Sequence, residues 1–146
     1  MLGTEIDECI QRVIGQRVTF RRLAGNTLIL YLNCNPDDNH GYSVWIEPTW
    51  HYANTTEVLV GSRQAQVDDK QELDEIAELM NGLDAAVIKS ISIDSISHDI
   101  HISFEQGYSI KSFVADPMDD FIWYISDRAS KLQLLASPRG VEIVDL

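Results

Sequence analysis

The chain has 146 residues, and 45% of them are hydrophobic, as in a globular protein with a buried core. Its 23 acidic and 11 basic residues give a net charge of −12, which repels nucleic-acid phosphates and anionic lipid. We therefore expect no nucleic-acid and no membrane partner, whereas a basic protein would be attracted. The alternative is that the acidity only keeps the protein in solution.

The two cysteines, Cys9 and Cys34, have the spacing of neither a disulfide framework nor a metal motif. The acidic start, MLGTEIDECI, lacks the long apolar run of a signal peptide. No segment reaches the roughly 20 apolar residues of a membrane span. These features predict a cytoplasmic protein that forms a single domain over residues 1–146.

The first predicted element is a helix over Thr4–Ile14, with Thr4 as its cap and Gly15 at its end. The hydrophobic period then changes to two, which predicts strands. In this half of the chain they cover residues 17–23, 27–33, 41–47, 50–52 and 57–60. The second of them has leucine at every inward position, but Ile29 and Tyr31 make its other face partly apolar.

The clearest helical pattern runs over Asp68–Gly82, with Asp69 and Glu72 in capping-box spacing. Strands follow over residues 87–93, 100–105, 108–114, 121–126, 132–136 and 141–144, and an acidic loop covers residues 115–120. Together the two periods predict a core. Its members are Leu28, Leu30, Leu32, Leu73, Ile76, Met80, Ile100, Ile102 and Phe104.

The tripeptide Gly-Tyr-Ser occurs twice, at residues 41–43 and 107–109, each time before a strand. When the two copies are aligned, the alternating strands 28–32 and 100–104 align as well. Each half then reads as a helix followed by a β-meander and an aromatic pair. We predict an α+β fold, mainly antiparallel β, built from two related helix-plus-β-meander repeats over about residues 4–67 and 68–146. Coincidence is the alternative, because alternating strands resemble one another. The aromatic pairs are Trp50 with Tyr52 and Trp123 with Tyr124.

No motif for catalysis or metal binding stands out. Residues 33–39 resemble the start of a calcium loop, but Asp38 and Val44 replace the required Gly and Glu, so a simple turn is favoured. His98 and His101 are three residues apart and point to opposite faces of a strand. The chain has neither a nucleophile elbow nor a phosphate loop. We therefore expect no catalytic residues, no metal and no cofactor.

A family resemblance rests on the segment Ile14-Gly15-Gln16-Arg17-Val18 and its recurrence after a Leu-Met-x-Gly-Leu helix end at residues 79–83. Each is followed by an alternating strand, a Gly-containing turn and an aromatic end with Trp. This pattern resembles a group of small uncharacterised bacterial proteins, some of them similar to immunity proteins of polymorphic toxin systems. The resemblance implies a protein without catalytic residues.

The sequence thus predicts a non-enzymatic protein-binding domain, in its sharpest form an immunity-like protein that neutralises a basic toxin. Two alternatives stay open. One is a structural protein that forms a homodimer through strand edges and aromatic residues, and the other is a small-molecule enzyme with an acidic pocket, for which the loop carboxylates could supply acid–base groups. For the tryptophans, packing in the core is favoured over contact with a partner, because aromatic side chains are as common on half-buried strands as at interfaces. The candidate partner-binding residues are Asp68, Glu72, Asp74, Glu75, Glu78, Asp116, Asp119, Asp120, Trp45, Trp50 and Trp123.

Overall fold

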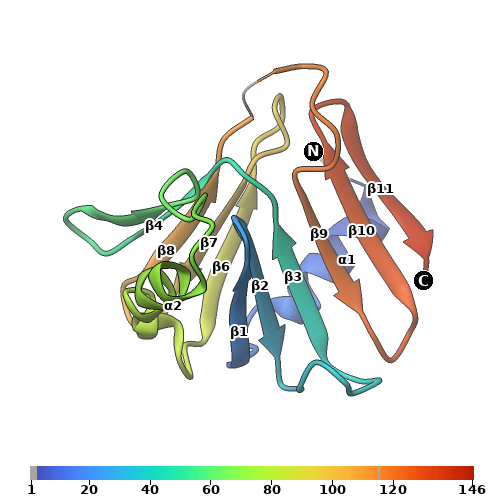
Figure 1. Ribbon diagram of the computed structural model, residues 1–146. Coiled ribbons are helices and arrows are strands. Elements are labelled where there is room, and N and C mark those ends of the chain that lie inside the picture. Colours follow the sequence, from blue (N-terminus) through green and yellow to red (C-terminus); the bar gives the residue numbers. More distant parts are fainter. Residues whose placement is uncertain (1–2, 115) are drawn as a thin grey trace.

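The computed structural model describes residues 3–114 and 116–146, so Ala115 of the predicted acidic loop lies outside the described residues. Two antiparallel sheets make up the molecule, and their strand orders are β1-β2-β3-β9-β10-β11 and β5-β4-β8-β7-β6. Helix α1 lies behind the six-stranded sheet in the view of Figure 1, and α2 lies in front of the five-stranded sheet. The predicted fold class, α+β and mainly antiparallel β, is confirmed.

The elements follow the chain in this order. The first half contains α1 (Thr4–Val13), β1 (Val18–Ala24), β2 (Thr27–Leu32), β3 (Tyr42–Ile46), β4 (Trp50–Ala53) and β5 (Val58–Gly61). The second half contains α2 (Lys70–Glu78), a 3₁₀ turn η1 (Asn81–Leu83), β6 (Ile88–Ile93), β7 (Ile100–Phe104), β8 (Ser109–Ser112), β9 (Trp123–Asp127), β10 (Leu132–Ser137) and β11 (Gly140–Asp145). Each predicted strand is present, and its ends lie within two residues of the predicted ones.

The helix caps were predicted with mixed success. Asp69 caps α2 as expected, and its carboxylate accepts a hydrogen bond from the Gln71 backbone N–H at 3.0 Å. The cap predicted at Thr4 is wrong, because Gly3 is the N-cap and Thr4 is already helical. Helix α2 also ends earlier than predicted, at Glu78, because the chain tightens into η1 before Gly82.

The two halves share one order of elements, but each sheet combines strands from both halves. Strand β3 of the first meander, β1-β2-β3, pairs with β9, and β10 and β11 follow in that sheet. Strand β8 of the second meander, β6-β7-β8, pairs with β4, and β5 follows at the edge. The two halves therefore exchange the hairpins that follow their meanders. The registers correspond: Leu30, Val44 and Ile125 lie opposite one another in the first sheet, as do Ile102, Ile110 and Tyr52 in the second.

Irregular features of the backbone repeat as well. Both meanders begin with a register shift between their first two strands, in β1 after Val18 and in β6 after Ile88. Gly41 and Gly107 both have left-handed backbone angles, with φ of 77° and 93°; Gly41 immediately precedes β3, and Gly107 lies two residues before the start of β8. Repeated irregularities are stronger evidence for two related units than the shared alternation, because alternation is common to most half-buried strands.

Trp50 and Trp123 occupy equivalent positions at the start of β4 and β9 and are fully buried. The Trp50 indole N–H donates to the Asn26 carbonyl at 2.8 Å, and the Trp123 indole N–H donates to the His98 carbonyl at 2.7 Å. Both acceptors belong to the turn between the first two strands of a meander. Both rings lie in the interior, as the favoured interpretation of the sequence has it, so these two tryptophans are removed from the candidate partner-binding residues.

One hydrophobic core joins both sheets and both helices. The halves meet at an isolated antiparallel bridge between Arg17 and Val87. Among the predicted core residues, Leu73 and Ile76 are only partly buried, because α2 lies on the surface with its outer side exposed. The others are buried, namely Leu28, Leu30, Leu32, Met80, Ile100, Ile102 and Phe104. In the part of the chain that the structure describes, no helix has the length and apolar character needed to span a membrane.

Candidate functional site

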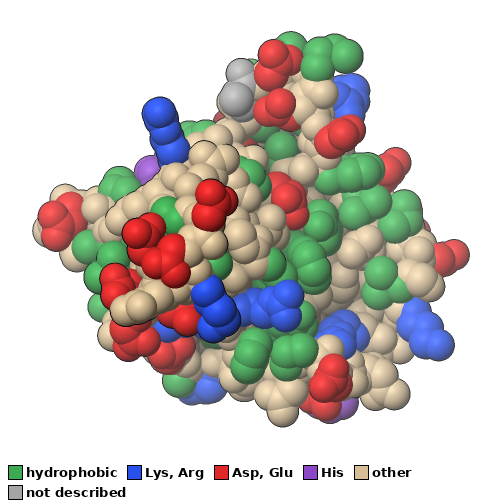
Figure 2. Space-filling view, viewed as in Figure 1, with side chains coloured by type: hydrophobic (Ala, Val, Ile, Leu, Met, Phe, Trp, Pro, Cys, Tyr) green, Lys and Arg blue, Asp and Glu red, His purple; other side chains and the backbone are tan. Residues whose placement is uncertain are grey.

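The six-stranded sheet has an outer face that points away from the common core. Residues that lie directly opposite each other in antiparallel strands share a face. We call this outer surface the aromatic face, and Figure 2 shows it as hydrophobic side chains grouped over β2, β3 and β9. It is made of two rows across the sheet, Arg22–Ile29–Trp45–Tyr124–Leu135–Glu142 and Phe20–Tyr31–Ser43–Ser126–Gln133–Val144.

The equivalent surface of the five-stranded sheet is polar. There, the row that corresponds to Ile29, Trp45 and Tyr124 contains His101, Lys111 and His51. The inner positions of the two sheets are apolar in both halves, whereas these outer positions differ in chemical character. Packing explains part of this apolar surface, because Ile29, Tyr31 and Cys34 are buried in a second, small cluster against which Trp45 packs. The partly exposed rings of Trp45 and Tyr124 remain, and the other sheet shows that the fold does not require aromatic side chains at their positions.

A stacked pair of rings forms the centre of the aromatic face. The Trp45 and Tyr124 ring centroids are 5.5 Å apart with an interplanar angle of 24°. The Tyr124 hydroxyl donates to the Glu47 carboxylate at 3.2 Å, and the Thr27 hydroxyl donates to the other carboxylate oxygen at 3.1 Å. Burial, and secondly the negative charge of Glu47, raise the pKa of Tyr124 to about 12, so this phenol stays a proton donor at neutral pH. These contacts fix the orientation of the stacked rings.

A shallow groove runs beside the stacked pair. Its floor is low because Ser43 and Ser126 are small, and both are buried. The Gln133 side chain donates to the Ser126 hydroxyl at 2.9 Å and closes part of the floor. Tyr31 lies on one side of the groove and the Trp45–Tyr124 pair on the other, with Pro36, Arg128 and Leu146 completing the lining. Such a groove suits an extended or flat group from a partner.

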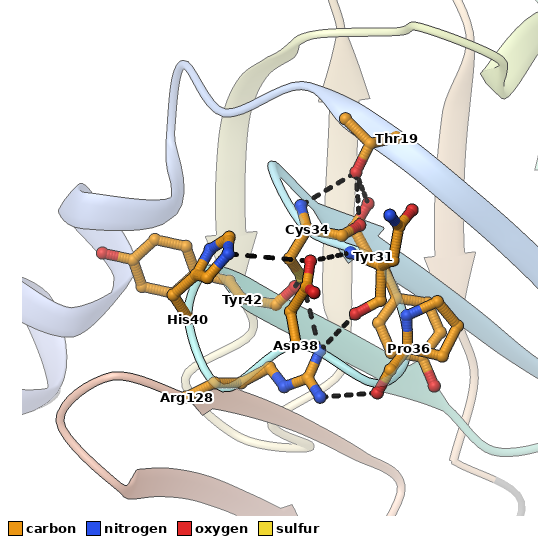
Figure 3. A network of polar contacts seen from close by, with 9 residues as sticks. Thr19, Tyr31, Cys34, Pro36, Asp38, His40, Tyr42 and Arg128 are labelled. Carbon is orange, nitrogen blue, oxygen red and sulfur yellow. Dashed lines mark hydrogen bonds and ion pairs between the residues drawn. The ribbon is translucent and has the colours of Figure 1, made fainter.

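Arg128 holds the loop over residues 33–41 against the edge of the groove (Figure 3). Its guanidinium donates to the carbonyls of Asn35 at 2.9 Å and Pro36 at 2.6 Å, and it lies 5.6 Å from the centroid of the Tyr31 ring. A cation over an aromatic ring is an attractive arrangement. The contacts restrict both the loop and the Tyr31 ring, so one wall of the groove is preformed.

The same loop is also tied to β1. The Thr19 hydroxyl donates to the Cys34 carbonyl at 2.6 Å and accepts from the Cys34 N–H at 3.0 Å. The Asp38 carboxylate accepts from the Asn35 N–H at 2.7 Å and lies 3.6 Å from His40. The segment that resembles a calcium loop in sequence is thus closed by its own hydrogen bonds.

The predicted acidic residues fall into two separate places. Those at α2 are all exposed, and Lys70 pairs with Asp74 at 3.1 Å. In Figure 2 their region and the aromatic face are on the same side of the molecule. The loop after β8 lies at the opposite end from α2 in Figure 1, and its Asp116 carboxylate accepts from the Met118 N–H at 2.8 Å. The structure does not bring the two groups together. The residues at α2 are Asp68, Glu72, Asp74, Glu75 and Glu78, and those of the loop are Asp116, Asp119 and Asp120.

Trp45 is the one predicted tryptophan that lies on the candidate site. The sequence interpretation missed Tyr31, Tyr124 and Arg128, although the apolar outward positions of β2 were the signal that pointed to this face. No three His, Cys, Asp or Glu side chains of the described residues come together in a way that could hold a metal ion. Comparison of the chain with protein-family models, curated proteins and solved structures finds no match.

Proposed function

We propose that this protein is a non-enzymatic binding domain that contacts a protein partner through the aromatic face. The observation that carries the proposal is the divergence between the two outer rows, aromatic at Trp45 and Tyr124 but polar at Lys111 and His51. Tyr, Trp and Arg are the residues enriched at the energetic centres of protein interfaces. Rings that are already fixed lose little conformational freedom when a partner binds.

The charge of the chain indicates a basic partner. The net charge is −12, and the carboxylates of α2 lie on the same side as the aromatic face. Long-range attraction would bring a basic protein to this side and speed its association. In its sharpest form, the proposal is an immunity-like protein that neutralises a basic toxin in the cytoplasm, as the sequence resemblance implies.

The experiment measures binding of the product of the adjacent gene, the first candidate partner under the immunity proposal, to the native protein and to Trp45→Ala. We expect the variant to bind about 30-fold more weakly, as when a hot-spot residue worth about 2 kcal/mol is truncated, and to lose affinity mainly through faster dissociation. The matched control is Lys111→Ala, at the equivalent position of the other sheet, which should bind like the native protein. Native affinity for Trp45→Ala would contradict the aromatic face as the contact.

A second variant, with Glu72, Glu75 and Glu78 replaced by glutamine, tests the role of α2 in the same assay. It should associate more slowly than the native protein and show a weaker dependence on salt, because screening acts on long-range charge attraction. Its stability should be unchanged, since exposed charges contribute little. Failure of the adjacent gene product to bind the native protein would contradict the immunity proposal.

A homodimer is the second candidate, because exposed apolar side chains lie on the aromatic face and at its edge. Phe20 is 42% exposed and Leu146 is 58% exposed. If the face binds a second copy of the chain, sedimentation should show a concentration-dependent dimer that Trp45→Ala dissociates. A native protein that stays monomeric at high concentration would exclude this function.

A further inference from the structure

Three nitrogen-bearing side chains form a row on the outer face of the five-stranded sheet. Lys111 lies on the central strand β8, directly opposite His101 of β7 on one side and His51 of β4 on the other. Directly opposed residues on neighbouring strands have Cβ atoms about 4.5–5.5 Å apart. We call these three residues the basic row. It continues into small residues at both ends, Ser92 and Gly61; Lys111 is exposed, and His51 and His101 are half-buried.

Phe113 lies beside the basic row. Its ring centroid is 4.7 Å from that of His51 and 5.6 Å from the Lys111 ammonium. The adjacent positions on this face carry hydroxyls, because Ser90, Ser103 and Ser109 lie opposite one another in the next row. The surface therefore combines N–H donors, hydroxyls and one aromatic edge.

The carboxylates nearest to the basic row are engaged elsewhere. The Asp99 carboxylate accepts from the Ser112 hydroxyl at 2.9 Å and from the Val114 N–H at 3.2 Å. One oxygen of Asp94 accepts from the backbone of the turn that follows it. Within the residues that the structure describes, no carboxylate lies within 4.0 Å of the Lys111 ammonium. The charge of Lys111 is thus available to a ligand.

We propose that the basic row binds a small dianionic oxyanion, either free phosphate or a phosphomonoester, with Lys111 at its centre and an imidazole N–H from His51 and His101 on each side. Phosphate oxygens accept several hydrogen bonds at once and bind most strongly to charged donors. The fold does not require this chemistry, because the equivalent row of the other sheet is Ile29, Trp45 and Tyr124. The chain as a whole has a net charge of −12, so a local row of basic side chains is a distinct feature and is suited to a negatively charged ligand.

Proton binding should be linked to anion binding at this site. Burial, and secondly the charge of Lys111, lower the pKa of both His51 and His101. The free protein therefore carries neutral imidazoles at neutral pH. A bound dianion favours the imidazolium form and raises both pKa values, so binding takes up protons. Affinity should accordingly rise as the pH falls toward the histidine pKa values.

The first test follows the imidazole resonances by NMR while sulfate is added to the full chain. Sulfate keeps its charge between about pH 6 and pH 8, so any change in affinity over this range comes from the protein. We expect saturable shifts at His51 and His101 and smaller ones at His40 and His98, with affinity at least about threefold higher at the lower pH. Equal or non-saturating shifts at all four histidines would overturn the proposal.

The second test compares variants and ligands. Lys111→Gln should abolish the saturable shifts, whereas Lys131→Gln, which removes a charge in the β9–β10 turn, should leave them. Retained binding by Lys111→Gln would overturn the proposal, and the dispersion of the spectra shows whether each variant is folded. Phenyl phosphate should bind more tightly than inorganic phosphate if the site serves a monoester, because Phe113 can contact the attached ring. Equal binding of the two would identify free phosphate as the ligand.

Discussion

Replacement of Trp123 by alanine is expected to lower the free energy of unfolding by about 3–5 kcal/mol. The ring is fully buried, so its removal leaves a large cavity that its neighbours fill only in part. The change also removes the hydrogen bond to the His98 carbonyl, which is 2.7 Å long. Trp50→Ala should cost a similar amount, because Trp50 makes the equivalent bond to Asn26 at 2.8 Å.

Chemical denaturation followed by circular dichroism measures this cost without relying on tryptophan emission. Trp45→Ala is the control, and its cost should be clearly smaller because Trp45 is only partly buried. Trp123→Phe keeps much of the apolar volume, so its loss of unfolding free energy should lie between those of Trp45→Ala and Trp123→Ala. A Trp123→Ala variant that is no less stable than Trp45→Ala would show that Trp123 does not belong to the core.

A second large effect is expected from Gly41→Ala, which should cost about 3 kcal/mol or more and exceed the cost of Gly107→Ala. Both glycines have left-handed backbone angles, so either substitution adds backbone strain of about 1–2 kcal/mol. At Gly41 an added Cβ would also lie 2.6 Å from the Leu32 carbonyl oxygen and from Cys34 Cβ. At Gly107 the nearest atom would be Thr55 Cγ2, at 3.5 Å, which is ordinary contact.

The difference between the two glycine variants tests the packing of the loop over residues 33–41, because the two glycines have similar left-handed angles and therefore similar backbone strain. Equilibrium denaturation of both variants gives the comparison directly. Equal costs would mean that this loop moves away without penalty. In that case Arg128 and Thr19 would not hold it in the way that their hydrogen bonds to the loop backbone indicate.

The local pattern of the sequence was enough to predict the elements of this fold. Leucines at alternate positions of β2 identified its inner face, and the cap at Asp69 identified the start of α2. The recurrence of Gly-Tyr-Ser identified two similar turns, because each glycine allows a left-handed angle at the entry to a strand. These features depend on neighbours in the chain, and such interactions are visible in a single sequence.

The exchange of hairpins was not predictable in the same way. Pairing of β3 with β9 joins segments about eighty residues apart, and alternation does not specify which strand is the partner. Trp50 follows the break at Pro48, so the alternation of β3 does not show where its ring points. The aromatic face was only partly anticipated, because β2 is apolar on both sides and is buried on both faces, so its pattern does not reveal the partly exposed rings on the neighbouring strands β3 and β9.

The central claim is that a partner covers the aromatic face, and acrylamide quenching of tryptophan fluorescence tests it directly. The chain has three tryptophans, and two of them, Trp50 and Trp123, are fully buried, so quenching in the free protein reports mainly on Trp45. When the partner saturates the protein, the quenching of Trp45 fluorescence by acrylamide should largely disappear. The partner either lacks tryptophan or has its own emission subtracted. If the partner binds and Trp45 remains as accessible to acrylamide as in the free protein, the aromatic face is not the contact.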